Sequence, residues 1–244
     1  MDFNLDGRVG LVTGGNSGIG RAIAVAFRDA GARVAIASRN AERNAAVAKE
    51  LGDDARAYEV DVGDAEAVAK LVDDVFEDFG RLDVLVNNAG MGRWTPAPNH
   101  DLNVWRRVLD VNLTSALVAS QRFAQRASGG KIINIVSEYA TFGGPGLISY
   151  TASKHGLEGL TKTLAIDLAP NFQVNAIQPG WIATPMTEPV QNSEDMNREV
   201  LLRTPMGRWG QPEDHAGAAV FLASSASDFV TGVTIPVDGG YRIR

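Results

Sequence analysis

Cysteine is absent from this chain of 244 residues, and its absence excludes several kinds of chemistry. Such a chain forms no disulfide, offers no thiolate to a metal ion and has no cysteine nucleophile. The three histidines, His100, His155 and His215, are scattered, and no carboxylates accompany them at the spacing of a metal site. We therefore expect no bound metal, and neither a hydrolase nor a metalloenzyme.

Long apolar runs are also missing. No uninterrupted stretch is long enough to cross a bilayer, and residues 1–6 lack the basic start and apolar run of a signal peptide. The 29 acidic residues outnumber the 23 basic ones, so the formal net charge is −6, which disfavours nucleic acid and anionic membranes as partners. We therefore expect the partner to be a small molecule. Because the lack of cysteine also fits a reducing compartment, we expect a cytoplasmic protein.

The residues that are present suit one α/β domain. A hydrophobic content of 45% with 21% charged residues allows a sizeable core, and no repeat or linker divides residues 1–244. Short apolar runs predict strands over residues 9–13, 32–37, 55–60, 84–86, 131–136, 173–177 and 233–237. Helix-forming stretches predict helices over residues 22–30, 41–51, 65–79, 101–127, 150–169 and 212–224.

A glycine-rich turn joins the first predicted strand to the first helix. Gly14 allows a tight turn, Gly18 lets a pyrophosphate approach backbone N–H groups, and Gly20 permits close helix packing. The alternative is a flexible surface loop. Because the turn lies between a buried strand and a helix, the sequence favours nucleotide binding.

The second predicted strand ends at Ser38 and Arg39, where many NAD-binding sites place a carboxylate for the ribose 2′-hydroxyl. Arg39 could pair with a 2′-phosphate and stack on adenine, while Ser38 donates a hydrogen bond to the same phosphate. Alternatively, Arg39 is a solvated charge beside a helix that Asn40 caps. The sequence therefore favours NADP(H), with NAD(H) possible.

Tyr150 and Lys154 are four residues apart, so on a helix they share one face. A nearby ammonium favours the phenolate form of tyrosine. Lowering the phenol pKa from about 10 to near 7 needs roughly 4 kcal/mol, which a desolvated site with Lys154 and a positively charged nicotinamide ring could supply. The spacing alone is common by chance, so the other motifs decide its meaning.

Two more polar residues are candidates for the same site. Ser137 follows the strand predicted over residues 131–136, at the sheet edge where open parallel sheets bind ligands, so it could reach a carbonyl oxygen. Asn112 lies inside a long predicted helix, where an amide is mildly unfavourable. A distorted turn there could hold a water molecule near Lys154.

Together these motifs resemble the short-chain dehydrogenase/reductase family in its compact single-domain form. The matching positions are Thr13-Gly14-x-x-x-Gly18-Ile19-Gly20, Asp61, Asn87-Asn88-Ala89-Gly90, Asn112, Ser137, Tyr150-x-x-x-Lys154 and Pro179-Gly180. The resemblance implies a Rossmann-type, doubly wound parallel sheet of seven strands in the order 3-2-1-4-5-6-7, in a three-layer α/β/α fold. It also implies a homotetramer assembled through the helices around residues 101–127 and 150–169.

The resemblance further implies roles for single residues. Tyr150 would be the acid or base, Ser137 would bind the substrate oxygen, and Lys154 would lower the phenol pKa and hold the nicotinamide ribose. Asn112 would anchor a water molecule of a proton relay. The implied cofactor-binding residues are Gly14, Asn16, Ser17, Gly18, Ile19, Gly20, Ser38, Arg39, Asp61, Val62, Asn88, Ala89, Gly90, Tyr150, Lys154, Pro179, Gly180, Ile182 and Thr184.

The substrate is less constrained. Residues 184–208 are polar with weak periodicity, which predicts a lid over the substrate. The chain resembles both 3-oxoacyl-acyl-carrier-protein reductases and sugar-acid dehydrogenases of the 2-deoxy-gluconate 3-dehydrogenase type, the latter commonly NAD-dependent. Glu138 beside Ser137 could favour polyols or face solvent. A non-catalytic dinucleotide sensor is the alternative of another class, although such sensors typically lack the tyrosine or the lysine.

Overall fold

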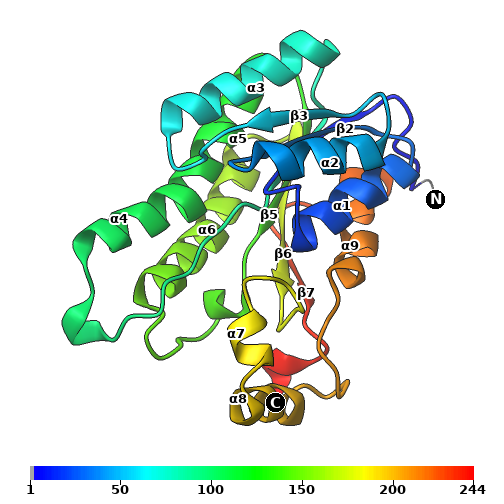
Figure 1. Ribbon diagram of the computed structural model, residues 1–244. Coiled ribbons are helices and arrows are strands. Elements are labelled where there is room, and N and C mark those ends of the chain that lie inside the picture. The colour runs from blue at the N-terminus through cyan, green and yellow to red at the C-terminus, as the bar shows by residue number, and fades with distance from the viewer. Residues whose placement is uncertain (1–2) are drawn as a thin grey trace.

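The computed structural model describes residues 3–244, and within them seven parallel strands form one sheet (Figure 1). The strand order is β3-β2-β1-β4-β5-β6-β7, which confirms the expected order and the α/β fold class. The strands are β1 (Val9–Thr13), β2 (Arg33–Ser38), β3 (Arg56–Glu59), β4 (Val84–Asn87), β5 (Gly130–Ile135), β6 (Phe172–Pro179) and β7 (Thr234–Val237).

Helices cover both faces of the sheet and make the three layers. They are α1 (Gly18–Asp29), α2 (Ala41–Leu51), α3 (Ala65–Phe79), α4 (Leu102–Leu109), α5 (Ser115–Arg126), α6 (Ile148–Asp167), α7 (Glu188–Gln191), α8 (Glu194–Arg203) and α9 (Ala216–Ala223). Successive residues of β1 serve opposite faces, because side chains alternate along a strand. Leu11 packs with α3, α5 and α6, whereas Val12 packs with α1, α2 and α9.

The helix expected over residues 101–127 is not continuous. A π-helical turn, Asp110–Thr114, separates α4 from α5. Single π-turns within helices occur frequently at functional sites because they shift the backbone hydrogen-bond pattern by one residue. Asn112, the polar residue that sequence reasoning singled out in this helix, lies in that turn.

Residues 184–208 form an insert after β6, and an isolated β-bridge between Ile182 and Gly210 joins its two ends. The N–H of Gly210 donates to the Trp181 carbonyl (2.9 Å), and the N–H of Ala183 donates to the Gly210 carbonyl (2.9 Å). The segment contains α7 and α8, so the weak periodicity in the sequence concealed two short helices. Figure 1 shows them beside the carboxyl terminus, beyond the strand ends of β6 and β7.

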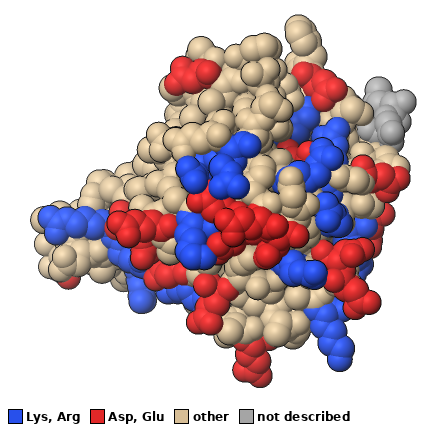
Figure 2. Space-filling view, turned by 90° about the horizontal axis from the view of Figure 1, so that it is seen from above, with Lys and Arg blue, Asp and Glu red and all other residues tan. Residues whose placement is uncertain are grey.

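The surface carries both signs of charge. On the face that Figure 2 shows, basic and acidic side chains are interspersed over the same area. In residues 3–244 no helix combines the length and the apolar character needed to cross a membrane.

Candidate active site

A crevice of about 230 Å³ opens at the carboxyl edge of the sheet, between the glycine turn and the start of residues 184–208. Most of the predicted site residues line it. They are Gly14, Ser17, Gly18, Ile19, Asn88, Ala89, Gly90, Ser137, Tyr150, Lys154, Pro179, Gly180, Ile182 and Thr184. The fold thus brings five segments of the chain to one cavity, as expected for a parallel sheet whose strands all end at the same edge.

The glycine turn is held by Asn88 at the end of β4. Gly14 has φ +66°, and a Cβ atom there would lie 2.8 Å from the Asn88 amide nitrogen. That amide donates to the Thr13 carbonyl (2.8 Å), and the N–H of Asn88 donates to the Thr13 hydroxyl (3.0 Å). Glycine is required at position 14 because an L side chain tolerates neither this backbone conformation nor this close contact. Gly20 packs against the Gly14 carbonyl in the same way.

The amino terminus of α1 opens on the crevice. Gly18 begins the helix, and Gly18 and Ile19 both line the cavity. Ser17 precedes the helix, and its side chain forms no capping hydrogen bond to the described residues. The first N–H groups of the helix are therefore available to an anion, which the helix dipole also favours.

Ser38 lies at the end of β2, but its hydroxyl is already committed. It donates to the Asn44 side-chain oxygen (2.6 Å) and accepts from the Asn16 amide (2.5 Å). A hydroxyl has a single proton, so Ser38 cannot also donate to a phosphate in this arrangement. This corrects the donor role expected from the sequence. Arg39 is exposed beside this network, outside the crevice.

Asp61 and Val62 follow β3, and neither lines the crevice. Asp61 pairs with Arg107 of α4, with 2.6 Å between the guanidinium nitrogen and the carboxylate oxygen. Burial alone would raise the Asp61 pKa, but hydrogen bonds from Arg107 and the Gly63 N–H lower it overall. Val62 is buried in the hydrophobic core, so only its backbone could contact a ligand.

Tyr150 and Lys154 share a face of α6 and both line the crevice, as their spacing predicted. The Lys154 ammonium lies 5.8 Å from the centre of the Tyr150 ring and donates to the Ile135 carbonyl (2.7 Å). Burial lowers the pKa of Lys154 to about 8. The ammonium is therefore desolvated, and desolvation strengthens its interaction with any anion placed beside it.

The phenol itself is not acidic in this arrangement. Burial raises the pKa of Tyr150; a hydrogen bond with Ser137 lowers it, and the Glu138 charge raises it further. Burial is the largest cause of this shift, and Lys154, which we expected to lower the pKa, is not among the groups that shift it. Among the protein groups, the Ser137 hydroxyl is the one that favours the phenolate.

Asn112 is fixed at the back of the site. Its side chain accepts from the Met91 N–H (2.8 Å) and donates to the Met91 carbonyl (2.9 Å) and the Ser153 hydroxyl (2.9 Å). A Cβ atom on Gly90 would lie 3.5 Å from the Asn112 side-chain oxygen and 3.7 Å from the Lys154 nitrogen. The asparagine and the lysine therefore flank one strand end.

Sequence reasoning missed several residues that line the crevice. Ile135 and Val136 complete the end of β5. Pro185, Met186 and Thr187 continue past Thr184 along the cavity wall, where the Thr187 hydroxyl donates to the Ile182 carbonyl (2.6 Å). The signal in the sequence was their position beside predicted site residues, since Ile135 and Val136 directly precede Ser137 and Pro185 directly follows Thr184.

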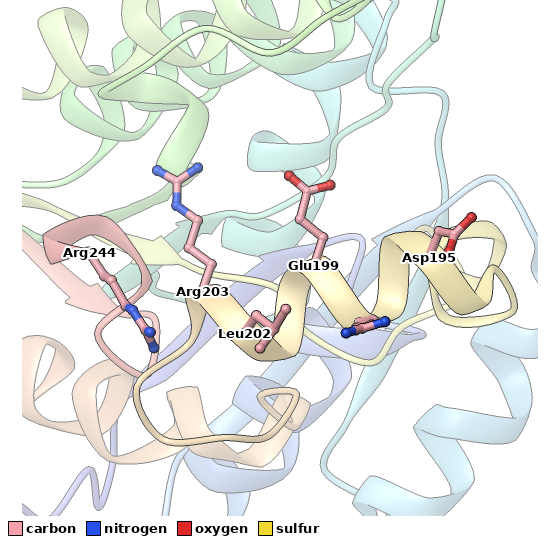
Figure 3. Close-up of a pocket in the computed structure, with 6 residues that line it drawn as sticks. Asp195, Glu199, Leu202, Arg203 and Arg244 are labelled. Carbon is pink, nitrogen blue, oxygen red and sulfur yellow. The ribbon is translucent and has the colours of Figure 1, made fainter.

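Glu138 does not face solvent, which corrects one of its two expected placements. The residue is 2% exposed and is not among those that line the crevice. A separate hollow of about 430 Å³, lined by Asp195, Arg198, Glu199, Leu202, Arg203 and Arg244, lies between α8 and the carboxyl terminus (Figure 3). It contains none of the predicted site residues.

In the part of the chain that the structure describes, no cluster of three or more histidine or acidic side chains could hold a metal ion.

The chain matches the family model described as enoyl-(acyl carrier protein) reductase over residues 14–242. A 2-dehydro-3-deoxy-D-gluconate 5-dehydrogenase of Dickeya dadantii is 41% identical over 99% of this chain and 98% of its own length. A 3-oxoacyl-acyl-carrier-protein reductase of Thermotoga maritima is 39% identical over 99% of this chain and 100% of its own length.

A solved structure has the same fold over the whole chain. The gluconate 5-dehydrogenase from Burkholderia cenocepacia, crystallised in complex with NADP and tartrate, is 36% identical with a TM-score of 0.95. The match covers 100% of this chain and 98% of that protein. Both types of enzyme that the motifs resemble, sugar-acid dehydrogenases and acyl-carrier reductases, are therefore among its relatives.

Proposed function

The chain belongs to the short-chain dehydrogenase/reductase family and is an NAD(P)-dependent oxidoreductase of ketones and secondary alcohols, and we propose that Tyr150 is its acid and base. The observation that carries this proposal is the meeting of Tyr150, Lys154 and Ser137 in one crevice with the glycine turn. A sensor without chemistry would not need a buried ammonium beside a buried phenol, since both cost stability.

The crevice fits a dinucleotide. A Cβ atom on Gly18 would lie 3.2 Å from the Thr184 side chain, so glycine keeps the space open between the turn and residues 184–187. The free N–H groups of α1 suit the pyrophosphate, and Asn88, Ala89 and Gly90 line the wall toward Lys154. When bound, the nicotinamide ring supplies or accepts the hydride.

Each catalytic side chain then has one task. Ser137 donates a hydrogen bond to the substrate oxygen, while Tyr150 gives that oxygen a proton during reduction and removes it during oxidation. Lys154 holds the ribose and adds positive potential. Because the protein alone leaves the Tyr150 pKa above its ordinary value, we infer that the positive charge of an oxidised nicotinamide ring is needed to bring it down.

Asn112 would hold a water molecule through which the proton returns to solvent. The π-helical turn around it frees a backbone carbonyl from the helix pattern, and such a carbonyl can hold a water molecule. The side chain cannot take this part, because Met91 and Ser153 already bind it.

We propose NADP(H) as the preferred coenzyme. Arg39 offers an exposed guanidinium at the end of β2, beside Asn16 and Ser38, and no carboxylate follows that strand directly. Asn16 replaces Ser38 as the proposed neutral donor to the 2′-phosphate, because an amide has two N–H bonds and one is directed at Ser38. NAD(H) would lack the partner for Arg39.

A sugar acid is the second candidate for the substrate. The Dickeya dadantii relative is named for a keto-deoxy sugar acid, and the Burkholderia cenocepacia enzyme carries NADP and tartrate. The Burkholderia cenocepacia enzyme was crystallised with NADP, so a sugar-acid substrate is compatible with the coenzyme proposed here. The other candidate is a ketone of the kind that acyl-carrier reductases reduce. One assay distinguishes the two substrates, because it compares NADP⁺ reduction by D-gluconate with NADPH oxidation by a β-keto ester.

We propose that residues 184–208 act as a lid and that the whole chain is one domain. The lid is anchored at Trp181–Ala183 and Gly210, whereas α7 has no buried residue and α8 has only Val200. A segment with so few buried contacts opens at low free energy. Residues 184–187 line the crevice, so ligand binding would order it.

We also propose a homotetramer in the cytoplasm. Helix α6 leaves space outside the chain at Gly159, where a Cβ atom would meet no described atom within 4 Å, and Ile166 on the same helix is 77% exposed. By contrast, Leu113 of the same chain fills the space at Gly156. The open part of the helix suits contact with a second subunit. The cytoplasmic location is supported separately, because the absence of cysteine suits a reducing compartment.

Replacement of Tyr150 by phenylalanine tests the assignment. Tyr150→Phe should lower kcat by roughly 10²- to 10⁴-fold, the range of a lost general acid, with nearly unchanged NADP⁺ affinity by fluorescence titration. Tyr139→Phe is the matched control, because its ring lies 6.2 Å from that of Tyr150 without lining the crevice. Full turnover in Tyr150→Phe would refute the assignment.

A further inference from the structure

Glu138 is a buried acid directly beside the catalytic serine. It is 2% exposed, and its Oε2 atom has no hydrogen-bond partner in residues 3–244. Glu138 opens the short turn that follows β5, and the next residue, Tyr139, donates its N–H to the Ser137 hydroxyl oxygen (3.2 Å). A buried carboxyl group without a partner is costly, and the reaction described above gives it no task.

Arg203 is a cation without an anionic partner, at the end of the lid helix α8. Its guanidinium lies 4.3 Å from the centre of the Tyr241 ring and 4.9 Å from that of Phe142. It forms no hydrogen bond or ion pair with any residue that the structure describes. Figure 3 shows Arg203 and Glu199 rising from the same side of α8, toward the body of the protein, yet they do not pair.

Arg203 packs on the turn that carries Glu138, since the N–H of Phe142 donates to the Glu138 carbonyl (3.3 Å). Burial raises the pKa of Glu138 to about 8; the Arg203 charge opposes that rise, and Asp238 of the turn after β7 adds to it. The other titratable groups that interact with Glu138 are Tyr139 and Tyr150 on the active-site side and Tyr241 on the carboxyl-terminal side. Arg203 is the nearby group that would stabilise an ionised Glu138.

We propose that Glu138 and Arg203 form a buried ion pair when the lid closes over a bound dinucleotide. Glu138 is then a positioning residue, because the pair fastens the end of α8 to the turn that carries Ser137. The inference rests on the proposed function, since the moving segment is the lid proposed there. It explains why an acid is kept at a position where burial opposes its charge.

A double-mutant cycle tests the pair with NADP⁺ as the probe. The variants are Glu138→Gln, Arg203→Met and the double variant, with Arg198→Met as the control because Arg198 is exposed on the same helix. The readout is the slowing of amide hydrogen exchange in residues 188–203 by saturating NADP⁺. Each single variant should lose roughly tenfold of this protection, which is within the range for contacting charged pairs. The double variant should lose no more protection than either single variant. Arg198→Met should show the same protection as the wild type.

The pH dependence separates an ion pair from a merely structural contact. Formation of the pair requires an ionised Glu138, so protection by NADP⁺ should increase as the pH rises toward about 8 in the wild type. In Glu138→Gln, which keeps the side-chain shape, protection should not change with pH. Circular dichroism verifies the fold, and Arg203→Gln replaces Arg203→Met if the latter unfolds.

Additive losses in the cycle, or full protection in Glu138→Gln, would overturn the ion pair. The readout does not depend on turnover. Tyr150→Phe should keep the protection even though it loses activity, so failure of the acid–base assignment and failure of the lid contact give different results.

Discussion

Lys154 should make the free protein less stable, by an amount that depends on pH. Burial lowers its pKa from the ordinary 10.5 to about 8, so the folded chain holds this proton less tightly than the unfolded chain does. At about 1.4 kcal/mol for each unit of pKa, the charged form costs the folded state about 3 kcal/mol. This cost to the folded state is absent above pH 10.5, develops as the pH falls toward about 8, and is complete below that.

Lys154→Met removes this cost together with the hydrogen bond to the Ile135 carbonyl. The lost hydrogen bond contributes a term that varies little with pH, so the pH dependence isolates the charge. The free energy of unfolding of the variant relative to the wild type should rise by about 3 kcal/mol between pH 10.5 and pH 7. Urea denaturation followed by tryptophan fluorescence, without dinucleotide, measures it at each pH.

Lys162→Met is the matched control. Lys162 lies on the same helix, but its side chain is 59% exposed and pairs with Glu158. The free energy of unfolding of Lys162→Met relative to the wild type should not change between pH 10.5 and pH 7, because water already hydrates the Lys162 ammonium. The free energy of unfolding of Lys154→Met relative to the wild type could instead stay constant, or fall, as the pH decreases to 7. Either result would show that the Lys154 ammonium is not desolvated, and the electrostatic argument for the site would fail.

Two further predictions concern the coenzyme and the fold. Ser38→Asp places a carboxylate beside Asn16, so the ratio of kcat/KM for NADPH over NADH should fall by at least about tenfold, or about 1.4 kcal/mol; an unchanged ratio would place the 2′-phosphate elsewhere. Burial lowers the pKa of His215, so the wild type should lose stability as the pH falls below 6.5, and His215→Gln should lose less between pH 7 and pH 5. Thermal melts measure this, with exposed His155→Gln as the control, and equal slopes would contradict it.

The fold and most of the crevice followed from local patterns. The Gly14 turn, the start of α1 and the Tyr150–Lys154 pair are encoded within a few residues each, and a parallel sheet then brings them to one edge. Sequence spacing reports such features because strand and helix periods fix which side chains share a face.

What sequence reasoning could not supply depends on contacts between distant segments. The Ser38 hydroxyl donates its proton to Asn44, and Asp61 is paired with Arg107 of α4. Neither partner is implied by a motif. Likewise, the raised pKa of Tyr150 reflects burial by the whole surrounding structure, which the spacing to Lys154 does not convey.

The junction between Trp181–Ala183 and Gly210 has an evolutionary consequence. The strands that hold the dinucleotide keep their register whatever lies between these two points, because no strand of the sheet falls in the interval. Selection can therefore rewrite this insert, which we propose to be the substrate lid, while the sheet stays intact. Glu138 marks the exception, since a lid that relies on it must retain its matching arginine.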